Sequence, residues 1–251
     1  MLGWSCQTQP VPDTLVFIPA WNEEESLPAV LEELHKDLPG ADVLVVDDGS
    51  TDDTSRTALE SGAAVLSFPR NRGLPAAIAA GYGFAAEHDY EYCGRVDADG
   101  QHLVAELRSL LEVVRAGSCD VAVGSRFAGT DGEGFSRDRY RMSRARRLGS
   151  GALRRSMGLV LGQPFHDATS GMYAANARAI AILARPYTST APEVEAVLRL
   201  DAAGLRVREV PVEMRERTSG ESKLQGKKAV AVVLTVTGTL IAAKLLRSRR
   251  G

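Results

Sequence analysis

Strand-like and helix-like segments alternate along the first half of the chain, and this alternation limits the possible folds more than any other feature. Apolar runs typical of strands occupy 14–19, 43–46, 63–68, 90–96 and 120–124. Helix-like segments lie between them at 23–37, 52–61, 73–87 and 104–116. This pattern predicts an α/β fold with a mostly parallel sheet that is flanked by helices on both faces.

The regular alternation ends near residue 126. After it we expect a glycine-containing loop, an arginine-rich helix, a turn at 166–171, two helices, a strand near 207–214 and a C-terminal helical region. The 251 residues are enough for one large domain, and no repeat or linker divides them. We therefore predict a tail at 1–13, a single domain at 14–228 and an apolar helix with basic ends at 229–251.

Composition excludes some functions and locates one unusual segment. The formal charge of −2 gives no reason to expect a nucleic-acid partner. Arginines are nevertheless concentrated between residues 137 and 155, where Asp138 is the only acid; they are Arg137, Arg139, Arg141, Arg144, Arg146, Arg147, Arg154 and Arg155. Such a block is usually a solvated face, but it could also contact phosphates or an anionic membrane.

The cysteines and the two ends of the chain bear on its location. Cys6, Cys93 and Cys119 are scattered and odd in number, which favours buried free thiols and a reducing cytoplasm. The N-terminus does not have the pattern of a signal peptide. The uncharged run at 229–243 is shorter than the roughly 20 residues that span a bilayer. We expect it to pack on the domain or lie at a membrane interface, next to its flanking lysines and arginines.

The segment Asp97-Ala98-Asp99-Gly100-Gln101 follows the strand expected at 90–96. Side chains at i and i+2 of a strand point the same way, so Asp97 and Asp99 could converge on one point, with Gln101 beside them. Carboxylate and amide oxygens suit Mg²⁺ or Mn²⁺, particularly when phosphate oxygens complete the shell. The alternative is a simple turn, which is common for this motif taken alone.

The first two strands also end in polar residues. The first leads into Pro19-Ala20-Trp21-Asn22-Glu23, and no Gly-x-Gly-x-x-Gly follows, which argues against a dinucleotide-binding Rossmann domain. The second leads into Asp47-Asp48-Gly49-Ser50-Thr51-Asp52. These carboxylates could accept hydrogen bonds from a nucleobase, or they could only cap the next helix, as Asp52 in particular could. Ligands of parallel sheets bind at this end of the strands.

Taken together, the motifs resemble those of family 2 glycosyltransferases with the GT-A fold. They are Pro-Ala-Trp-Asn-Glu (19–23), Val-Asp-Asp-Gly-Ser-Thr-Asp (46–52), Asn-Arg-Gly (71–73), Asp-Ala-Asp-Gly-Gln-His (97–102) and Gly-Ser-Arg-Phe (124–127). Asp-Ala-Thr-Ser-Gly (167–171) and the segment from Arg217 to Lys223 are similar to those of polyprenyl-phosphate sugar synthases, the dolichol-phosphate mannose synthase group. The resemblance covers residues 14–228. It implies a GT-A-type, Rossmann-like sheet with an acceptor-side helical region near the C-terminus.

The resemblance also implies a role for each matching residue. Those that would bind the donor base, ribose and diphosphate are Pro19, Trp21, Glu23, Asp48, Asp97, Ala98, Arg217 and Lys223. Asp99 and Gln101, with Asp97, would hold the metal. Those at the reaction centre and the acceptor phosphate would be Asp99, Arg126, Arg146, Ser150 and Asp167. Arg144 or Arg147 could replace Arg146, Asp167 could instead cap a helix after Ser170, and His102 is more readily a hydrogen-bonding residue than a catalytic one.

The implied reaction is an inverting, metal-dependent transfer of mannose or glucose from a nucleotide sugar to a polyprenyl phosphate, by a cytoplasmic enzyme held peripherally at the inner face of the membrane. Two alternatives remain open. One is a family 2 glycosyltransferase with a soluble acceptor, for which the arginine block and C-terminal helix would be dispensable. The other is a nucleotide-sugar binding protein without turnover, although such a protein would not need Asp99, Gln101 and Arg217. A sugar-1-phosphate nucleotidyltransferase is disfavoured because the first strand is not followed by a glycine-rich loop.

Overall fold

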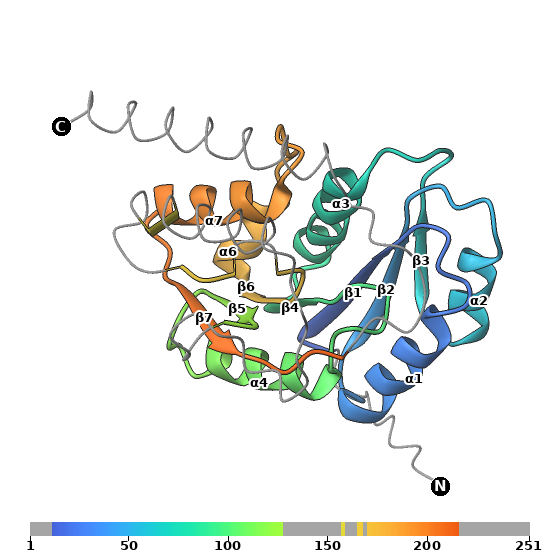
Figure 1. Cartoon of the computed structure of the whole chain (residues 1–251), viewed down its shortest axis with the longest axis horizontal. Coiled ribbons are helices and arrows are strands. Elements are labelled where there is room, and N and C mark those ends of the chain that lie inside the picture. The colour runs from blue at the N-terminus through green and yellow to red at the C-terminus, as the bar shows by residue number, and fades with distance from the viewer. Residues whose placement is uncertain (1–11, 128–156, 159–164, 168–169, 216–251) are drawn as a thin grey trace, which may run out of the picture.

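A single mixed sheet forms the centre of the molecule (Figure 1). The structure is a computed structural model, and it describes residues 12–127, 157–158, 165–167 and 170–215. The strands of these residues are β1 (Thr14–Ala20), β2 (Asp42–Asp47), β3 (Ala64–Ser67), β4 (Tyr92–Arg95), β5 (Val121–Ser125), β6 (Tyr173–Asn176) and β7 (Val207–Pro211). Their order across the sheet is β3-β2-β1-β4-β6-β5-β7, and only β6 among them runs antiparallel to its neighbours. The predicted mostly parallel α/β sheet is confirmed.

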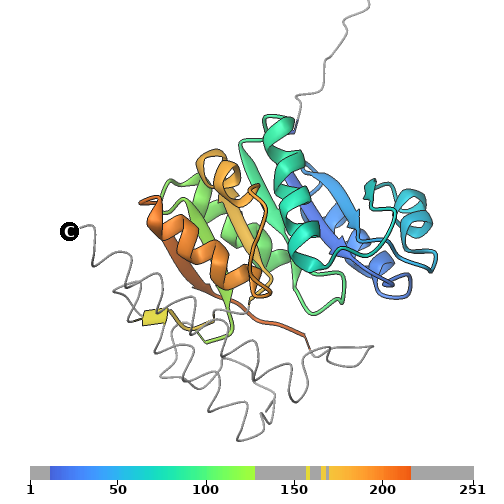
Figure 2. The ribbon, with the colours of Figure 1, turned by 90° about the horizontal axis from the view of Figure 1, so that it is seen from above.

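Helices cover both faces of this sheet (Figures 1 and 2). They are α1 (Leu27–Asp37), α2 (Thr54–Glu60), α3 (Leu74–Glu87), α4 (Val104–Arg115), α6 (Ala177–Leu183) and α7 (Pro192–Ala202). One hydrophobic core joins α3, α6 and α7 to the sheet, and the other joins α1, α2 and α4 to its opposite face. Side chains of β1 alternate between the two cores, so that Phe17 lies in the first and Ile18 in the second. β1 is therefore buried on both sides, as a central parallel strand should be.

The predicted start of the first helix was wrong for a local reason. α1 begins at Leu27 and not at residue 23, because the N–H groups of Ser26 and Leu27 both turn back to the carbonyl of Glu23. Pro28 then occupies the first turn of the helix, where a missing N–H costs nothing. The predicted buried face of this helix, with Leu27 and Leu34 at its ends, is confirmed.

The prediction missed β6, which is only four residues long. Its sequence is Tyr-Ala-Ala-Asn, and two small residues give little strand signal. β6 nevertheless fills the centre of the sheet between β4 and β5, with Ala174 and Ala175 fully buried. The alternative role for Asp167, capping a helix after Ser170, is wrong, because the segment after Ser170 leads into this strand and not into a helix.

The expectations for the cysteines can be compared with the structure, whereas those for the two ends of the chain and the arginine block fall outside the described residues. Cys93 and Cys119 are buried free thiols, as predicted. In the part of the chain that the structure describes, no helix is long and apolar enough to cross a membrane. The tail at 1–11, the arginine block and the C-terminal helix expected at 229–251 lie outside the described residues.

Candidate active site

Most of the polar motifs meet at one edge of the sheet. β1, β2 and β4 are parallel, so the loops that follow Ala20, Asp47 and Arg95 leave from the same edge. Since β6 is antiparallel, the segment that precedes it begins at that edge as well, with Tyr173 opposite Arg95. The loop after Ser125 in β5 joins them. The topology thus brings together motifs that are up to 150 residues apart in the sequence.

Hydrogen bonds tie the loop after β1 to the loop after β2. The Asn22 N–H donates to Ser50 Oγ at 2.9 Å, and the Asn22 amide oxygen accepts from the Thr51 N–H at 2.9 Å. The Glu23 N–H donates to Thr54 Oγ1 at 2.9 Å. Asn22 has a φ of 54°, a left-handed conformation that asparagine tolerates better than most residues. The two loops therefore form one wall.

Asp48 binds the loop before α3, which contains Arg72 and Gly73, and holds it against this wall. Its buried carboxylate accepts the Arg72 N–H on one oxygen and the Gly73 N–H on the other, both at 2.7 Å. Gly49 lies so close to this loop that an added Cβ would stand 2.3 Å from the carbonyl carbon of Arg70. The role in base binding stays a prediction for Asp48, but the carboxylate has a clear structural task in the free protein.

The other donor-site candidates on this side differ in exposure. Trp21 is 39% exposed, so its ring presents a stacking surface at the edge. Pro19 is buried within β1, and Ala98 is 3% exposed. The Glu23 carboxylate accepts a hydrogen bond from Ser26 Oγ at 2.8 Å. Of these residues, Trp21 has the largest surface available to a ligand.

The Asp97–Asp99 motif is a turn, which corrects the prediction that strand geometry aligns its carboxylates. β4 ends at Arg95, and the chain turns sharply at Gly100, where φ is 73°. Asp99 Oδ1 accepts the Gln101 N–H at 3.1 Å and closes this turn. The short polar side chain of an aspartate can form such a bond to the backbone two residues on, which overrides strand alternation here.

His102 supports the same turn from inside the protein. Its Nδ1 accepts the Asp97 N–H at 3.0 Å, so the proton of the neutral ring is on Nε2. Burial lowers the pKa of His102, against the opposing effect of Asp97 and Asp99. The hydrogen-bonding role predicted for His102 agrees with this geometry.

The residues that precede the predicted Arg217–Lys223 loop are anchored beside this turn. The Arg215 N–H donates to the Gln101 carbonyl at 2.9 Å, and Met214 pairs with His102 in an isolated bridge. The Arg215 guanidinium also binds both oxygens of Glu33 at 2.8 Å. The described chain ends at Arg215, so Arg217 and Lys223 themselves lie outside it.

Behind the turn lies an ion pair network that the sequence analysis missed. Arg95 is buried, and its Nη2 donates to Glu193 Oε1 at 3.0 Å and to Asp97 Oδ1 at 3.3 Å. Burial raises the pKa of Glu193, while the nearby guanidinium of Arg95 opposes this shift. An arginine within a strand two residues before an acidic motif is a usable signal for Arg95, whereas nothing in the sequence places Glu193 opposite it.

The acidic turn has the right donor atoms for a hard divalent cation. Asp97, Asp99 and Gln101 offer carboxylate and amide oxygens, the ligands of Mg²⁺ and Mn²⁺. Across 12–127 and the later described segments, no three His, Cys, Asp or Glu residues gather as a ready metal cage. The donor set therefore fits a cation whose shell is completed by ligands from a substrate, as phosphate oxygens would do.

A second charged pair, Arg126 and Asp167, lies at the same edge of the sheet. Arg126 donates to Asp167 through Nε at 2.8 Å and through Nη2 at 2.9 Å, and its backbone N–H donates to the same carboxylate at 3.2 Å. The Asp167 side chain is 1% exposed and that of Arg126 is 42% exposed. Glu209 holds the turn from behind by accepting the backbone N–H groups of His166 and Asp167. This geometry presents a guanidinium to solvent on a buried carboxylate, a suitable arrangement for binding an anion.

The remaining candidates cannot be placed. Arg146 and Ser150, together with the alternatives Arg144 and Arg147, lie outside the described residues. Among the described residues, the structure therefore brings together Asp97, Ala98, Asp99, Gln101, Arg126 and Asp167 around one edge, beside the wall formed by Trp21, Glu23 and Asp48.

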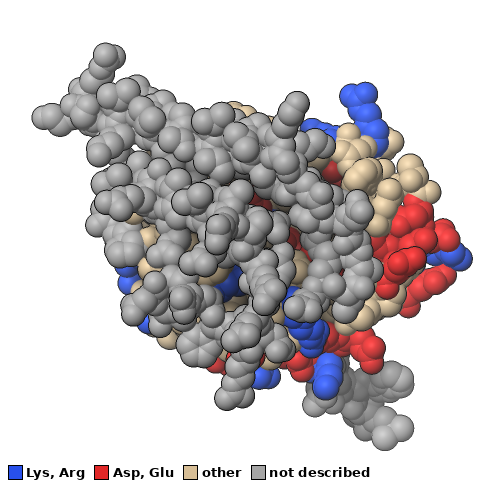
Figure 3. All heavy atoms as spheres, in the orientation of Figure 1, with Lys and Arg blue, Asp and Glu red and all other residues tan. Residues whose placement is uncertain are grey.

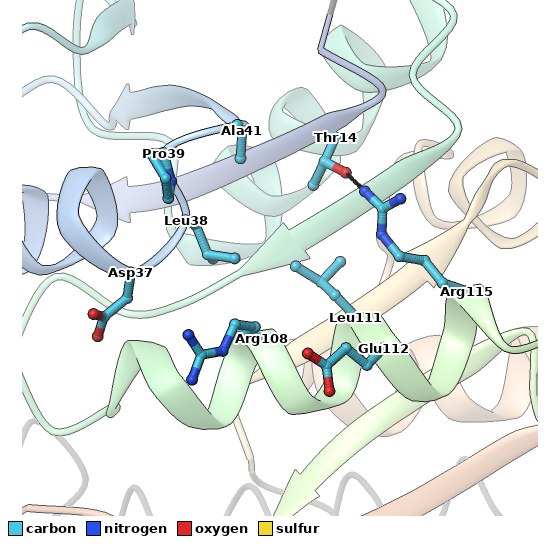
Figure 4. Close-up of a pocket in the computed structure, with 10 residues that line it drawn as sticks. Thr14, Asp37, Leu38, Pro39, Ala41, Arg108, Leu111, Glu112 and Arg115 are labelled. Atoms are coloured by element: carbon cyan, nitrogen blue, oxygen red, sulfur yellow. Dashed lines mark hydrogen bonds between the residues drawn. The ribbon is translucent and has the colours of Figure 1, made fainter.

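The hollow shown in Figure 4 is a separate feature. It has a volume of about 270 Å³ and is lined by the loop after α1 and by residues of α4, including Arg108 and Leu111. Thr14, the first residue of β1, borders it, and the Arg115 guanidinium donates to the Thr14 hydroxyl (Figure 4). The hollow therefore lies at the amino edge of the sheet, opposite the candidate active site.

Comparison with known proteins agrees with this geometry. The family model described as glycosyl transferase family 2 matches residues 15–180. An undecaprenyl-phosphate mannosyltransferase from Micrococcus luteus is 35% identical over 94% of this chain and 98% of its own length. A polyprenol monophosphomannose synthase from Mycolicibacterium smegmatis is 32% identical over 96% of this chain and 92% of its own length. The chain belongs to glycosyl transferase family 2, which confirms the predicted family and enzyme class.

Solved structures confirm the GT-A fold. Glucosyl-3-phosphoglycerate synthase from Mycobacterium tuberculosis, in complex with Mn²⁺, UDP-glucose and phosphoglyceric acid, superposes with a TM-score of 0.67 at 20% identity, over 90% of this chain and 79% of its own. Mannosyl-3-phosphoglycerate synthase from Rubrobacter xylanophilus gives a TM-score of 0.68 at 19% identity, over 95% and 75%. At such low identity these similarities concern the fold alone.

Proposed function

We propose that this glycosyltransferase moves a hexose, mannose or glucose, from a nucleotide sugar to a polyprenyl phosphate in a reaction that needs Mg²⁺ or Mn²⁺. The observation that carries the proposal is the meeting of the acidic Asp97–Asp99 turn with the Arg126–Asp167 pair at one edge of the sheet. Two relatives that align over nearly their whole length are named for transfer to a polyprenyl phosphate, and both names specify mannose. Mannose is therefore the favoured sugar.

The donor would bind along the wall at the ends of β1 and β2. In the proposal, Trp21 stacks against the nucleobase, Asp48 accepts from the base, and Pro19 and Glu23 complete the base and ribose pocket. The hydrogen bonds between the two loops support this assignment, because a wall fixed before binding loses little entropy when the ligand arrives. Asp97 and Ala98 would lie beside the ribose and diphosphate.

The leaving diphosphate gains negative charge as the sugar departs, and the proposal assigns several groups to this charge. Asp99 and Gln101, with Asp97, would hold the divalent cation, which supplies Lewis-acid stabilisation of the diphosphate. Arg217 and Lys223 would add positive charge from the segment that follows the anchored Arg215. These donors are most valuable when they are positioned before the reaction begins.

The acceptor phosphate would be held on the opposite side. It is already an anion near neutral pH, so the reaction needs positioning in line with the breaking C–O bond more than it needs a strong base. We assign this positioning to Arg126, with Arg146 and Ser150. The bidentate contact between Asp167 and Arg126 favours a role for Asp167 in orienting the Arg126 guanidinium over a role in proton transfer.

A matched substrate assay tests the proposal. Purified protein with Mn²⁺ is given GDP-mannose or UDP-glucose as donor, and either a polyprenyl phosphate or 3-phosphoglycerate as acceptor. We expect transfer to the polyprenyl phosphate and inversion at the anomeric carbon. Transfer to 3-phosphoglycerate alone would favour the soluble-acceptor glycosyltransferase, and nucleotide-sugar binding without any transfer would favour the binding protein.

The membrane contact is a separate part of the proposal, placing the protein at the inner face of the membrane. Exposed acids after β1 and around α2 form an acidic end in Figure 3; they include Glu24, Glu25, Asp53 and Glu60. An anionic bilayer would repel this end, so we assign the contact to the arginine block and the basic-ended helix at 229–251. Binding to anionic vesicles should then weaken as salt increases, since each surface Lys or Arg contributes about 1 kcal/mol.

Arg146→Ala separates the lipid acceptor from a soluble one. Loss of one charge-assisted contact, about 1.5–3 kcal/mol, should raise the KM for polyprenyl phosphate about tenfold or more. The KM for the nucleotide sugar should change little, because Arg146 is assigned to the acceptor. Unchanged acceptor kinetics, together with no vesicle binding at low salt, would contradict the polyprenyl-phosphate assignment.

A further inference from the structure

A buried arginine lies directly behind the acidic turn. Arg95 is the last residue of β4, and its side chain is 3% exposed. It points to the face of the sheet that is covered by α3, α6 and α7, where its guanidinium lies 6.0 Å from the centre of the Tyr173 ring. A charge in such a place is costly unless it is paired.

Two carboxylates share this guanidinium. Glu193 comes from the first turn of α7, and Asp97 comes from the acidic turn two residues after Arg95. A single nitrogen, Nη2, serves both, at 3.0 Å and 3.3 Å. Arg95 therefore connects α7, a helix of the outer layer, to a carboxylate of the acidic turn.

The carboxylate of Asp97 is also limited on its other oxygen. A Cβ added at Gly171 would stand 2.2 Å from Asp97 Oδ2, so this oxygen lies directly against the glycine backbone. Oδ1 meanwhile accepts from Arg95. The Asp97 N–H is bound to His102 as well, so the backbone and the side chain of this residue are both held in place.

Burying Arg95 in this way costs stability. Arg95 Nε is buried and has no hydrogen-bond partner among the described residues, although an unsatisfied buried donor costs free energy. An apolar side chain in this strand would avoid that cost and the cost of burying the charge. What the arginine adds is a fixed contact to Asp97.

We propose that Arg95, anchored by Glu193, is a positioning residue that fixes the Asp97 carboxylate for binding of the donor's ribose and diphosphate. This inference rests on the proposed function and assigns to it a pair of residues outside the motifs. Arg95 acts through Asp97 and does not itself touch the donor. Removing it should weaken nucleotide binding through a mobile and more strongly negative Asp97.

The test is calorimetric titration of the full chain with a nucleoside diphosphate, GDP or UDP, in the presence of Mn²⁺. Three variants are compared with the wild type: Arg95→Met, the double variant Arg95→Met/Glu193→Met, and Arg199→Met. Arg199 lies on α7, where it pairs with Glu195 and stacks on Tyr187, so it controls for the loss of an arginine from the same layer. Thermal unfolding of each variant is measured in parallel.

We expect Arg95→Met to lower the melting temperature and to weaken nucleotide binding about tenfold or more. The double variant removes both buried charges, so its melting temperature should recover while its nucleotide affinity should not. If Arg95→Met does not fold, the double variant alone provides the measurement. Arg199→Met should lose some thermal stability and keep its affinity.

Recovery of nucleotide affinity in the double variant would overturn the inference, because Arg95 would then serve stability only. An unchanged affinity in Arg95→Met would overturn it as well. Wild-type transfer from nucleotide sugar to polyprenyl phosphate is measured separately, so failure of this inference leaves the proposed function standing. A wild type that binds neither nucleotide would instead refute the donor site itself.

Discussion

The two edges of the sheet use carboxylates in different ways. At the amino edge, Asp13 pairs with Arg115, Asp42 accepts from the Tyr90 hydroxyl at 2.6 Å, and Asp120 accepts from the Asn176 amide at 3.0 Å and the Arg206 N–H at 2.9 Å. At the carboxyl edge, Asp97 must share one guanidinium with Glu193. The amino-edge carboxylates join neighbouring strands and loops, and their own partners satisfy them.

This difference supports the proposal that ligands bind at the carboxyl edge. Arg95 pairs with both Asp97 and Glu193 at this edge, and the oxygen donors of Asp99 and Gln101 follow Asp97 in the same turn. Carboxylate and amide oxygens of this kind suit a hard divalent cation. The same edge also exposes the Arg126 guanidinium for an anion. An oxygen-donor turn beside a half-exposed guanidinium suits the proposed reaction, which brings a cation and phosphates together.

Among the substitutions, we expect the largest loss of activity from removing the Asp99 carboxylate of the proposed metal site. Asp99→Ala should reduce turnover at least about a hundredfold, because metal stabilisation of a leaving group supplies several kcal/mol. It should also abolish the Mn²⁺-dependent part of donor binding while the protein stays folded. Steady-state kinetics and circular dichroism provide the two measurements.

Asp53→Ala is the matched control, since Asp53 is an exposed acid that pairs with the surface residue Arg56. This variant should keep nearly full turnover. Full activity of the wild type in EDTA would remove the metal from the proposal, whatever the behaviour of Asp99→Ala.

At the amino edge, the corresponding substitution should affect stability and not activity. Asp120→Ala would leave the Arg206 N–H and the Asn176 amide without their acceptor, at a cost of about 2–3 kcal/mol. Urea unfolding should show this loss, while the KM values of the remaining folded enzyme stay unchanged. A large change in kinetics would mean that the two edges are not functionally distinct.

Asp48 lies at the carboxyl edge, but backbone N–H groups satisfy its carboxylate, as partners do at the amino edge. Asp48→Asn places an amide group against one of the N–H donors of Arg72 and Gly73, and we expect a loss of about 1–2 kcal/mol in stability. If Asp48 also accepts from the base, the KM for the donor should rise as well. A loss of stability with an unchanged KM would restrict Asp48 to holding the loop.

The parts of the fold and of the candidate site that could be predicted from the sequence are those set by residues close together in the chain. The strand at β1 and the buried face of α1 follow from apolar periodicity, and the loop after β2 follows from Asp-Asp-Gly-Ser. The meeting of the loops after β1, β2 and β4 at one edge follows from parallel topology. These elements need no information from elsewhere in the chain, so the sequence predicted them.

The features that escaped prediction depend on contacts between distant segments. β6 is recognisable as a strand only because β4 and β5 lie on both sides of it. Glu193 meets Arg95 only after α7 packs on the sheet, and Gly171 meets Asp97 only through the antiparallel register of β6. The predicted strand geometry of Asp97 and Asp99 failed because side-chain bonds to the backbone formed a turn instead.

The smallest expected effect concerns the acid stability of the amino edge. The hydrogen bond from Arg115 lowers the pKa of Asp13 below its usual value of 3.8, although burial opposes the shift. A lowered pKa in the folded state means that the contribution to stability is present above pH 3.8 and is lost as the pH falls through the folded pKa. The pair is about 40% exposed, so this contribution should be only about 0.2–1 kcal/mol. Asp13→Asn should therefore make the wild-type loss of stability below pH 4 slightly shallower in urea titrations, and high salt should reduce the difference. An equally steep loss in both proteins would show that this pair contributes nothing and that the acid sensitivity comes from more buried carboxylates such as Asp120.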